Sequence, residues 1–454
     1  MNLKFCGGAQ AVTGVNYLFT TARTKFIVDC GLFQGTRDLE IKNTEPFIYD
    51  PQTIDFALIS HAHLDHIGRL PRLVKEGFVG QIYATPPTID FARLLLEDAQ
   101  KLMAEKTKKA DVMPLTTPGD VEKVMKLFVP VEYEKEISPS PDVSFTFYDA
   151  GHILGSCITK IKIKEKGDIK TIVHSGDLGN HPAPILRTPA LIEQADYVLV
   201  ESTYGDRLHL HEETSAKDLL EDVIEETVSR GGALMIPSFA MERTQQLLYQ
   251  LNDLIENGRI PKVPVYIDSP LAIKITEMYK KYENYFDQSA DALVRSGDDI
   301  FDFPNLHFTE TTEQSKQINE VPPPKIIIAG SGMSQGGRII HHETRYLPDP
   351  KSTLMIVAYQ AEGTLGRRLA EGVKRVKIFD EEVLVRAQVV QLEAYSAHAD
   401  QQGLLRWLGH FQKPLKKIFV VQGEQAASRA LAVKIRDDLG VASLVPIFGQ
   451  EVTL

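Results

Sequence analysis

Hydrophobic residues in the first two hundred positions form short runs separated by turn residues, a pattern that predicts β-strands. These runs are apolar or alternating, and they lie at 26–28, 56–59, 145–147 and 171–173. Apolar positions from Leu94 to Leu102 instead have helical spacing and predict a helix over about 87–109. The first part of the chain is therefore expected to be rich in strands.

From about residue 210 the pattern changes to alternating helices and strands. A helical stripe over 219–228 ends at the Gly231-Gly232 pair. The elements expected after it are a strand at 233–237, a helix at 243–257, and strands at 265–268 and 325–329. Such alternation is typical of βαβ units on a parallel sheet. Strand-like pieces return near Val389 and again at 417–421, so we expect one strand-rich domain (1–208 and 391–454) interrupted by an α/β insert (209–390).

Composition narrows the class of protein. With 454 residues, 43% hydrophobic and 24% charged, the chain is expected to be globular. No apolar run reaches the roughly 18 residues of a membrane span, and no secretory signal is visible, so no membrane association is expected. Three widely spaced cysteines favour a reducing, cytoplasmic location. The net charge of −11 argues against nonspecific coating of nucleic acid, but it is compatible with a nuclease.

The segment His61-Ala62-His63-Leu64-Asp65-His66 directly follows a predicted strand. Histidine nitrogens and carboxylate oxygens are the ligands of zinc ions that stay reactive. Alternate residues of an extended backbone share a side, so His61 and His63 can reach one ion while Asp65 and His66 serve a second. Chance gives such a pattern in about one in a thousand chains of this composition. The segment therefore predicts a metal site rather than solvated histidines.

Three residues outside this segment, two after it and one before it in the sequence, are candidate members of the same metal site. His152 lies between glycines, and Asp177 follows the strand at 171–173, where a carboxylate could bridge two metals. Asp29 ends the strand at 26–28 and is expected to orient a ligand histidine. Taken alone, each of these is more often a structural residue, and the histidine motif is what gives them weight.

The order of these residues resembles the motif series of the metallo-β-lactamase fold. The resemblance implies a four-layer αββα sandwich in which His61, His63 and His152 hold one metal. It also implies a second metal on Asp65 and His66, with Asp177 between the two ions. In that family a bridging hydroxide attacks an ester, amide or phosphodiester, and the two metals stabilise the attacking and leaving oxygens.

Further segments resemble the β-CASP group, nucleases of RNA maturation that include the cleavage subunit of mRNA 3′-end processing and ribonuclease J. The segments lie at 201–206, 236–240, 330–337, 359–367 and 396–400. The resemblance implies that the α/β insert is a β-CASP domain. It also implies that Glu201 and His398 sit over the metals, with the histidine near the scissile phosphate. A histidine beside a carboxylate can protonate the leaving oxygen at neutral pH.

A glycine-rich loop follows the strand predicted at 325–329 and precedes a predicted helix. Backbone N–H groups in such a loop can bind a phosphate, although a simple tight turn has the same sequence signature. Basic residues of the helix, including Arg338 and His342, could add contacts or could form a solvated face. The residues expected to bind phosphate are Ser331, Gly332, Met333, Ser334 and Arg367.

Gln422 departs from the family pattern. RNA-acting members have a metal-binding histidine at this position, before Gly423-Glu424, whereas DNA-acting members have valine. An amide oxygen is a weaker zinc ligand than imidazole. We therefore expect two divalent ions, most simply Zn²⁺, with a weaker second site that is tuned to a harder metal such as Mn²⁺.

Together these observations predict a metal-dependent RNA phosphodiesterase of RNA processing or decay, acting on single-stranded RNA. Both endonuclease and 5′-exonuclease modes are compatible with the sequence. The alternatives are a catalytically weakened RNA-binding paralogue and a small-molecule hydrolase on the same fold. A homodimer or partners in a processing complex would also fit.

Overall fold

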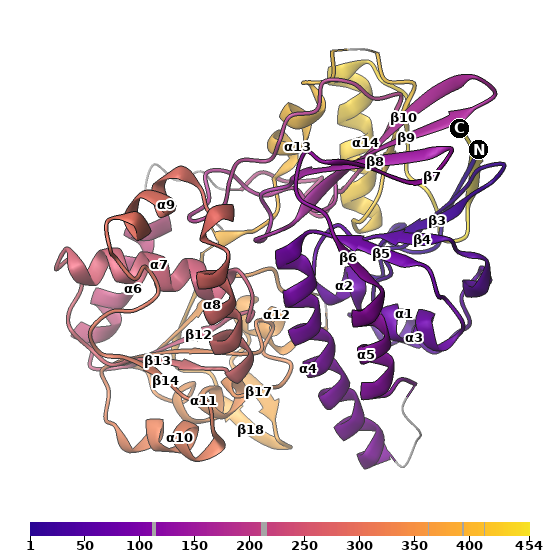
Figure 1. Ribbon diagram of the computed structural model, residues 1–454. Helices are drawn as coiled ribbons and strands as arrows, with labels where there is room; N and C mark the ends of the chain where they lie inside the picture. Colours follow the sequence, from indigo (N-terminus) through magenta and orange to yellow (C-terminus); the bar gives the residue numbers. More distant parts are fainter. Residues whose placement is uncertain (111–114, 210–215, 362, 393–394, 413) are drawn as a thin grey trace. The chain divides into compact units, whose positions relative to one another are not determined.

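The computed structural model describes residues 1–454 except 111–114, 210–215, 362, 393–394 and 413, and except the side chains of 106–110 (Figure 1). The chain divides into two compact units. The first combines Met1–Leu208 with His398–Leu454, and the second is His209–Ala397. The expected change of domain at 390–391 falls beside β19 (Gln388–Gln391), which is still paired with a strand of the second unit.

The first unit contains two sheets of seven described strands each. One has the order β22-β1-β2-β3-β4-β5-β6. Its strands are β1 (Asn2–Phe5), β2 (Tyr17–Thr20), β3 (Lys25–Val28), β4 (Phe56–Leu58), β5 (Gln81–Ala84), β6 (Phe128–Pro130) and β22 (Glu451–Thr453). The antiparallel pairing of β1 with β22 joins the two ends of the described chain.

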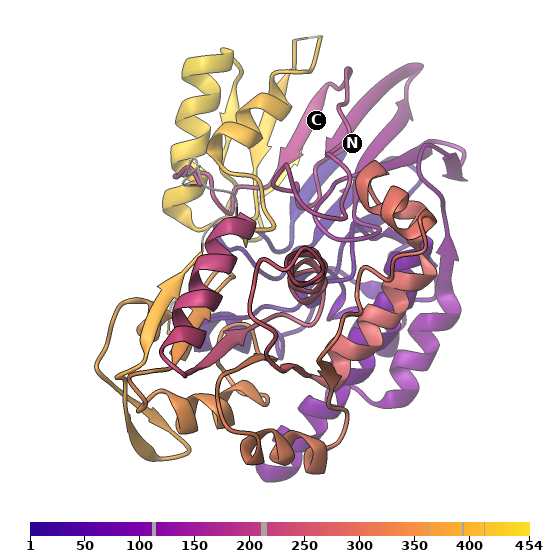
Figure 2. The same cartoon turned by 90° about the vertical axis from the view of Figure 1, so that its left-hand side faces the viewer.

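The other sheet has the order β21-β20-β11-β10-β9-β8-β7. Its strands are β7 (Glu136–Ser140), β8 (Val143–Asp149), β9 (Cys157–Glu165), β10 (Asp168–His174), β11 (Tyr197–Val200), β20 (Lys417–Val420) and β21 (Ser443–Leu444). The parallel partners β11 and β20 are separated in sequence by the whole second unit. Both views show the yellow C-terminal segment beside the magenta strands (Figures 1 and 2).

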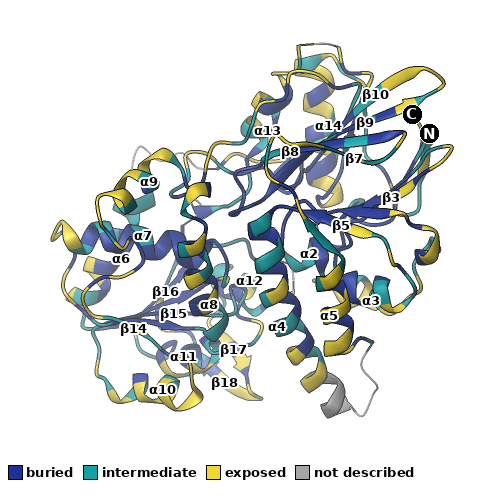
Figure 3. Ribbon diagram, viewed as in Figure 1, coloured by how far each residue is buried: buried dark blue, intermediate teal, exposed yellow. Residues whose placement is uncertain are grey.

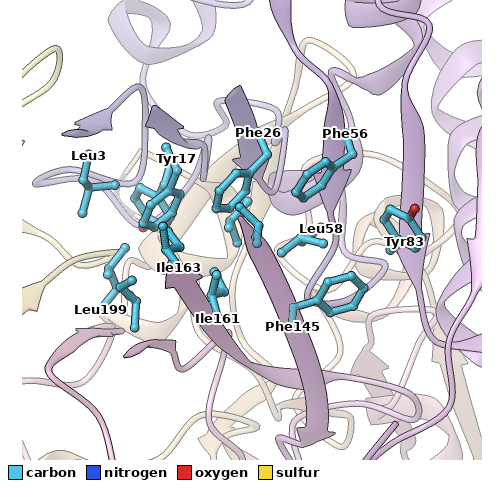
Figure 4. Close-up of a cluster of buried hydrophobic side chains, with 14 of the residues drawn as sticks. Leu3, Tyr17, Phe26, Phe56, Leu58, Tyr83, Phe145, Ile161, Ile163 and Leu199 are labelled. Carbon is cyan, nitrogen blue, oxygen red and sulfur yellow. The ribbon is translucent and has the colours of Figure 1, made fainter. Parts of the chain in front are cut away.

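Side chains from both sheets form one buried core. Phe26 stacks on Phe19 and on Phe56 with ring centroids 4.9 Å apart in each case, and Phe145 of the facing sheet packs near Tyr83 (Figure 4). The alternating pattern of the sequence thus places one face of each sheet in a shared interior, which is where most of the hydrophobic stabilisation arises. The central strands of both sheets are correspondingly buried along most of their length, whereas the edge strands β6, β7, β21 and β22 are intermediate or exposed (Figure 3).

Helices cover the outer faces of the two sheets. Leu404, Trp407 and Leu431 of the C-terminal helices pack with strand residues of the second sheet in another core cluster. Figure 1 shows helices α2 to α5 beside the first sheet. The helices are α1 (Arg37–Ile41), α2 (Leu64–Ile67), α3 (Leu70–Lys75), α4 (Pro86–Ala110), α5 (Pro118–Leu127), α13 (Gln401–Leu408) and α14 (Gln425–Leu439), with a 3₁₀ turn at Pro51–Thr53. The predicted αββα arrangement is therefore confirmed.

The second unit contains a six-stranded sheet in the order β14-β13-β15-β12-β16-β19, and every pairing in it is parallel. Its other strands are β12 (Ala233–Pro237), β13 (Val265–Asp268), β14 (Leu306–Phe308), β15 (Lys325–Ala329) and β16 (Thr353–Ile356). The helices are α6 (Ala216–Ser229), α7 (Arg243–Glu256), α8 (Pro270–Lys281), α9 (Gln288–Arg295), α10 (Thr312–Gln317), α11 (Ile339–Tyr346) and α12 (Leu365–Ala370), with 3₁₀ turns at Glu283–Tyr285 and Ile318–Glu320. A hairpin of β17 (Arg375–Ile378) and β18 (Glu381–Leu384) is also present. The expected parallel insert is confirmed.

None of the helices in the described ranges combines the length and the apolar character that crossing a bilayer requires.

Candidate metal centre

The loop after β4 brings two histidines together. The backbone leaves the strand at Leu58, and His63 becomes the residue that precedes the first turn of α2. His61 Nε2 and His63 Nδ1 lie 3.0 Å apart, and His152 Nε2 lies 3.2 Å from the same His63 nitrogen. Three ring nitrogens thus converge on one point.

Asp177, in the loop after β10, completes this cluster. Its Oδ2 lies 3.6 Å from His61 Nε2 and 3.5 Å from His152 Nε2. The four ligand atoms of His61, His63, His152 and Asp177 all lie within 4.8 Å of one another. Three imidazoles and one carboxylate form a donor set that suits a zinc-like cation.

Asp65 and His66 lie beside this cluster. His66 Nε2 is 3.3 Å from Asp177 Oδ1 and 3.7 Å from Asp65 Oδ2, because the first turn of α2 carries both side chains toward Asp177. Gln422 comes from the loop after β20 and places its Nε2 3.1 Å from His66 Nε2. Asp177 therefore stands between the two groups of residues that the sequence assigned to two ions.

Asp29 and Ser60 contact the Nδ1 atoms of two of these histidines. Asp29 Oδ2 lies 2.8 Å from His66 Nδ1, and its two oxygens accept the backbone N–H and the hydroxyl of Ser60 at 2.7 Å each. The Ser60 hydroxyl is also 3.1 Å from His61 Nδ1. A carboxylate that accepts the Nδ1 proton leaves the lone pair on Nε2, the nitrogen that faces Asp177.

The protonation states suit a bound cation. Burial lowers the pKa of His63 to about 4 and that of His61 well below its ordinary value, so both rings are neutral and have a free lone pair. Burial also acts against a charge on His66, but Asp177, Asp29 and Asp65 outweigh it and raise its pKa well above the usual range. A proton on His66 thus offsets part of the negative charge of Asp177, Asp29 and Asp65. Since a divalent cation would balance them better, the residues fit a metal.

Glu201 and His398 form a pair next to the cluster. Glu201 follows β11, is fully buried, and has its two carboxylate oxygens 3.2 and 3.1 Å from His398 Nδ1. Burial opposes a charge on His398, yet Glu201 and then Asp177 raise its pKa to about 9. The ring of His398 lies 4.5 Å from that of His152, centroid to centroid. A protonated imidazole is therefore held against the candidate ligands.

Backbone contacts connect these segments. Gly179 forms a β-bridge with His398, and the Leu178 N–H donates to Glu201 Oε1 at 2.6 Å. A side chain at Gly179 would place its Cβ 1.8 Å from the carbonyl oxygen of Gly151, beside His152. Ser60 and Gly179 were not predicted from the sequence, although both directly adjoin motifs that were.

His174 was also missed. It ends β10, three residues before Asp177, and its ring lies 5.4 Å from that of Tyr17. Neither ring nitrogen has a hydrogen-bond partner among the described residues. Burial lowers the pKa of His174 to about 4, so it is a neutral ring packed behind the candidate ligands.

The glycine-rich loop lies in the second unit, between β15 and α11. Ser334 is buried and donates to Glu343 Oε1 at 2.5 Å, and Arg367 is paired with Glu371 at 2.7 Å. Phosphate binding by Ser331, Gly332, Met333, Ser334 and Arg367 stays a prediction.

Two of the basic residues that follow the loop, for which the sequence left phosphate contact and a solvated face both open, have an acidic partner within the second unit. Arg338 and His342 bind the buried carboxylate of Asp268 at 2.8 and 2.7 Å. These two contacts connect α11 to β13.

Comparison with known families identifies three matching segments. Residues 18–195 match the metallo-beta-lactamase superfamily domain, 244–369 the Beta-Casp domain, and 382–446 the Zn-dependent metallo-hydrolase RNA specificity domain.

Similar proteins cover almost the whole chain. Ribonuclease TTHA0252 of Thermus thermophilus is 38% identical over 99% of this chain and 96% of its own length. Transcription termination factor FttA of Methanosarcina mazei is 31% identical over 96% of this chain and 69% of its own length. An RNase J-like protein of Methanocaldococcus jannaschii is 32% identical over 98% of each chain.

Proposed function

We propose that this chain, which belongs to the β-CASP group of the metallo-β-lactamase superfamily, is a ribonuclease that hydrolyses single-stranded RNA at the cluster around Asp177. The observation that carries the proposal is the convergence of His61, His63, His152 and Asp177, with Asp65 and His66 on the other side of Asp177. The names of two of the relatives, a ribonuclease and an RNase J-like protein, support RNA as the substrate.

Two divalent ions fit these residues. His61, His63 and His152 would hold the first, Asp65 and His66 the second, and Asp177 would contact both. When bound, such ions lower the pKa of a water molecule and stabilise negative charge on the phosphate oxygens. The nitrogen-rich first group favours Zn²⁺, whereas the oxygen-rich second group also suits Mn²⁺.

His398 is proposed to give a proton to the leaving oxygen of the scissile phosphodiester. Glu201 accepts from Nδ1, so Nε2 is the nitrogen that can reach a substrate. Glu201 contributes most to raising the pKa of His398, and this favours the protonated ring that a general acid requires. Glu201 acts through His398 and is therefore a positioning residue.

Gln422 decides how firmly the second ion is held. A protonated His66 Nε2 and the Gln422 amide nitrogen are both donors, yet they face each other at 3.1 Å. A 180° turn of the amide exchanges these atoms and points Oε1, which is buried without a partner, toward the second group. An amide oxygen in place of an imidazole gives a weaker site with less preference for zinc.

The second candidate function is RNA binding without cutting. The replacement of the expected histidine by Gln422 favours it, since loss of the second ion would weaken hydrolysis. The termination factor among the relatives is named for a role other than cleavage. The close approach of the six other residues predicted as ligands supports the enzyme over this second candidate.

The test uses purified protein, single-stranded RNA labelled at its 5′ end, and Zn²⁺ or Mn²⁺. We expect cleavage that disappears in His63→Ala and Asp177→Ala and persists in the control His410→Ala, which removes an exposed histidine. The length of the labelled product distinguishes a 5′-exonuclease from an endonuclease. Metal analysis should give two ions per chain. Absence of cutting with either metal would refute the enzyme, and RNA binding retained without cutting would support the second candidate.

A further inference from the structure

A small hollow lies in the first unit, apart from the metal cluster. Cys6, Asn16, Phe33, Arg69 and Phe448 are among the residues that line it, and none of the lining residues is a candidate metal ligand. Including its open mouth, the hollow encloses about 250 Å³. The unusual feature of this hollow is that its arginine, Arg69, is buried without an acidic partner among the described residues.

Arg69 follows α2 and is only 7% exposed. Its backbone N–H donates to the carbonyl of Cys30, which fixes the residue in place. Its guanidinium forms no hydrogen bond or ion pair with any residue that the structure describes, and Nε is completely buried. A guanidinium has five N–H donors, and leaving even the buried Nε–H without an acceptor is unfavourable. An unpaired buried cation of this kind favours binding of an anion.

Aromatic rings hold the guanidinium without satisfying its donors. Its central carbon lies 4.1 Å from the ring centroid of Phe47 and 5.6 Å from that of Phe33. Cation–π contacts act on the face of the planar group, so the N–H groups at its edge stay available. Lys42 is held in the same way, with Nζ 3.8 Å from the centroid of Phe448.

Among the described residues, no carboxylate forms an ion pair with Arg69 or Lys42, although Glu76 is close enough to raise the pKa of Arg69 against the lowering effect of burial. Burial raises the pKa of the Cys6 and Cys30 thiols to about 12, so both are neutral. Burial likewise raises the pKa of the Tyr49 hydroxyl well above its usual value. Arg72, whose guanidinium also lies near the Phe47 ring, is paired with Glu76. Glu45 at the mouth is exposed and has no ion pair with Arg69 or Lys42 in the described chain.

We infer that this hollow is an anion site that binds a phosphate group between Arg69 and Lys42. Arginine binds phosphate through two parallel N–H···O bonds, and the Tyr49 hydroxyl can donate a further one. The phosphate binds at the edge of the guanidinium, and any remainder of the ligand extends out of the hollow. Free phosphate and the terminal phosphate of a mononucleotide share this chemistry. The inference is independent of the proposed ribonuclease activity.

The experiment is a calorimetric titration of the metal-loaded protein with inorganic phosphate. Because the metals can also bind phosphate, the informative quantity is the difference between variants. Arg69→Met should weaken one binding event at least tenfold, and Lys42→Met should weaken it several-fold. Glu45→Gln should tighten it, because a competing carboxylate is removed. The control Arg23→Met removes an exposed arginine and should change nothing.

Adenosine 5′-monophosphate and adenosine then identify the source of the phosphate. Tighter binding of the nucleotide than of phosphate supports a nucleotide ligand, and the reverse supports the free ion. Equal binding of adenosine and its monophosphate overturns the inference, as does unchanged phosphate binding in Arg69→Met. If Arg69→Met does not fold, the arginine is structural, and unchanged affinity in both Lys42→Met and Glu45→Gln overturns the site.

Discussion

Asp29→Asn tests whether the second ion depends on the carboxylate behind His66. Asp29 has a φ of +58°, and asparagine tolerates this left-handed conformation, so the exchange alters charge and acceptors with little backbone strain. The carboxylate accepts three hydrogen bonds, from the Ser60 N–H, the Ser60 hydroxyl and His66 Nδ1. An asparagine has one oxygen for these donors, and its NH₂ group must face another donor.

The expected loss concerns the second ion specifically. When His66 Nδ1 no longer finds an acceptor, the ring favours a proton on Nε2, where the metal would bind. Loss of such a supporting carboxylate costs about 10- to 100-fold in metal affinity, or roughly 1.4 to 2.7 kcal/mol. The first ion should be much less affected, because only His61 of its ligands touches Ser60.

The assay is competition of the loaded protein with a chromophoric chelator, which resolves the two affinities. The control is Asp142→Asn, a buried carboxylate of the same unit that accepts from Thr21 and Thr24 at 2.6 Å each. It should lower stability and leave both metal affinities unchanged. Two ions bound to Asp29→Asn with wild-type affinity would refute the reasoning, and so would an equal loss of both.

Three further changes have defined outcomes. Gln422→His should tighten the second site and shift its preference toward zinc; a metal dependence equal to that of wild type would contradict this. Glu343→Gln should remove a pH dependence of stability. Burial raises the pKa of Glu343 from the ordinary 4.5 to about 8, so the wild type loses stability as the pH rises between these two values. Urea unfolding of both proteins at pH 5 and pH 8 would measure this loss. An equal change in unfolding free energy between pH 5 and pH 8 in the wild type and in Glu343→Gln would contradict this prediction. Phe56→Ala should destabilise the first unit by about 3 to 5 kcal/mol, because the ring packs on Phe26 and Tyr83, whereas the exposed Phe379→Ala should cost little; equal melting temperatures of the two variants would refute this.

Local patterns predicted most of the architecture. Each strand and helix of the α/β insert that the alternation indicated is present, because a buried parallel strand and its covering helix have distinct hydrophobic periods. The histidine motif was recognisable because four candidate ligands lie within six residues. The predicted metal roles of these residues stay predictions that the titrations above would test.

Contacts between distant segments could not be derived in this way. The sequence left phosphate contact and a solvated face both open for Arg338 and His342, because their partner, Asp268, lies 70 and 74 positions earlier. In the sequence, Gly179 resembles an ordinary turn glycine, and only the structure shows that the backbone of Gly151 leaves no room for a side chain there. Arg69 has the appearance of a surface arginine, and only the folded chain shows that it is buried without an acid.

The pairing of β11 with β20 affects how the protein is made. Translation adds about 5 to 20 residues per second, so the ribosome completes the continuous second unit before it reaches β20 and Gln422, which lies in the loop after that strand. Until then, the first unit lacks β20, β22 and His398, and its metal ligands have only part of their surroundings. Metal loading is therefore expected to be a late, post-synthetic step, and nascent chains halted before residue 398 should fail to retain the ions.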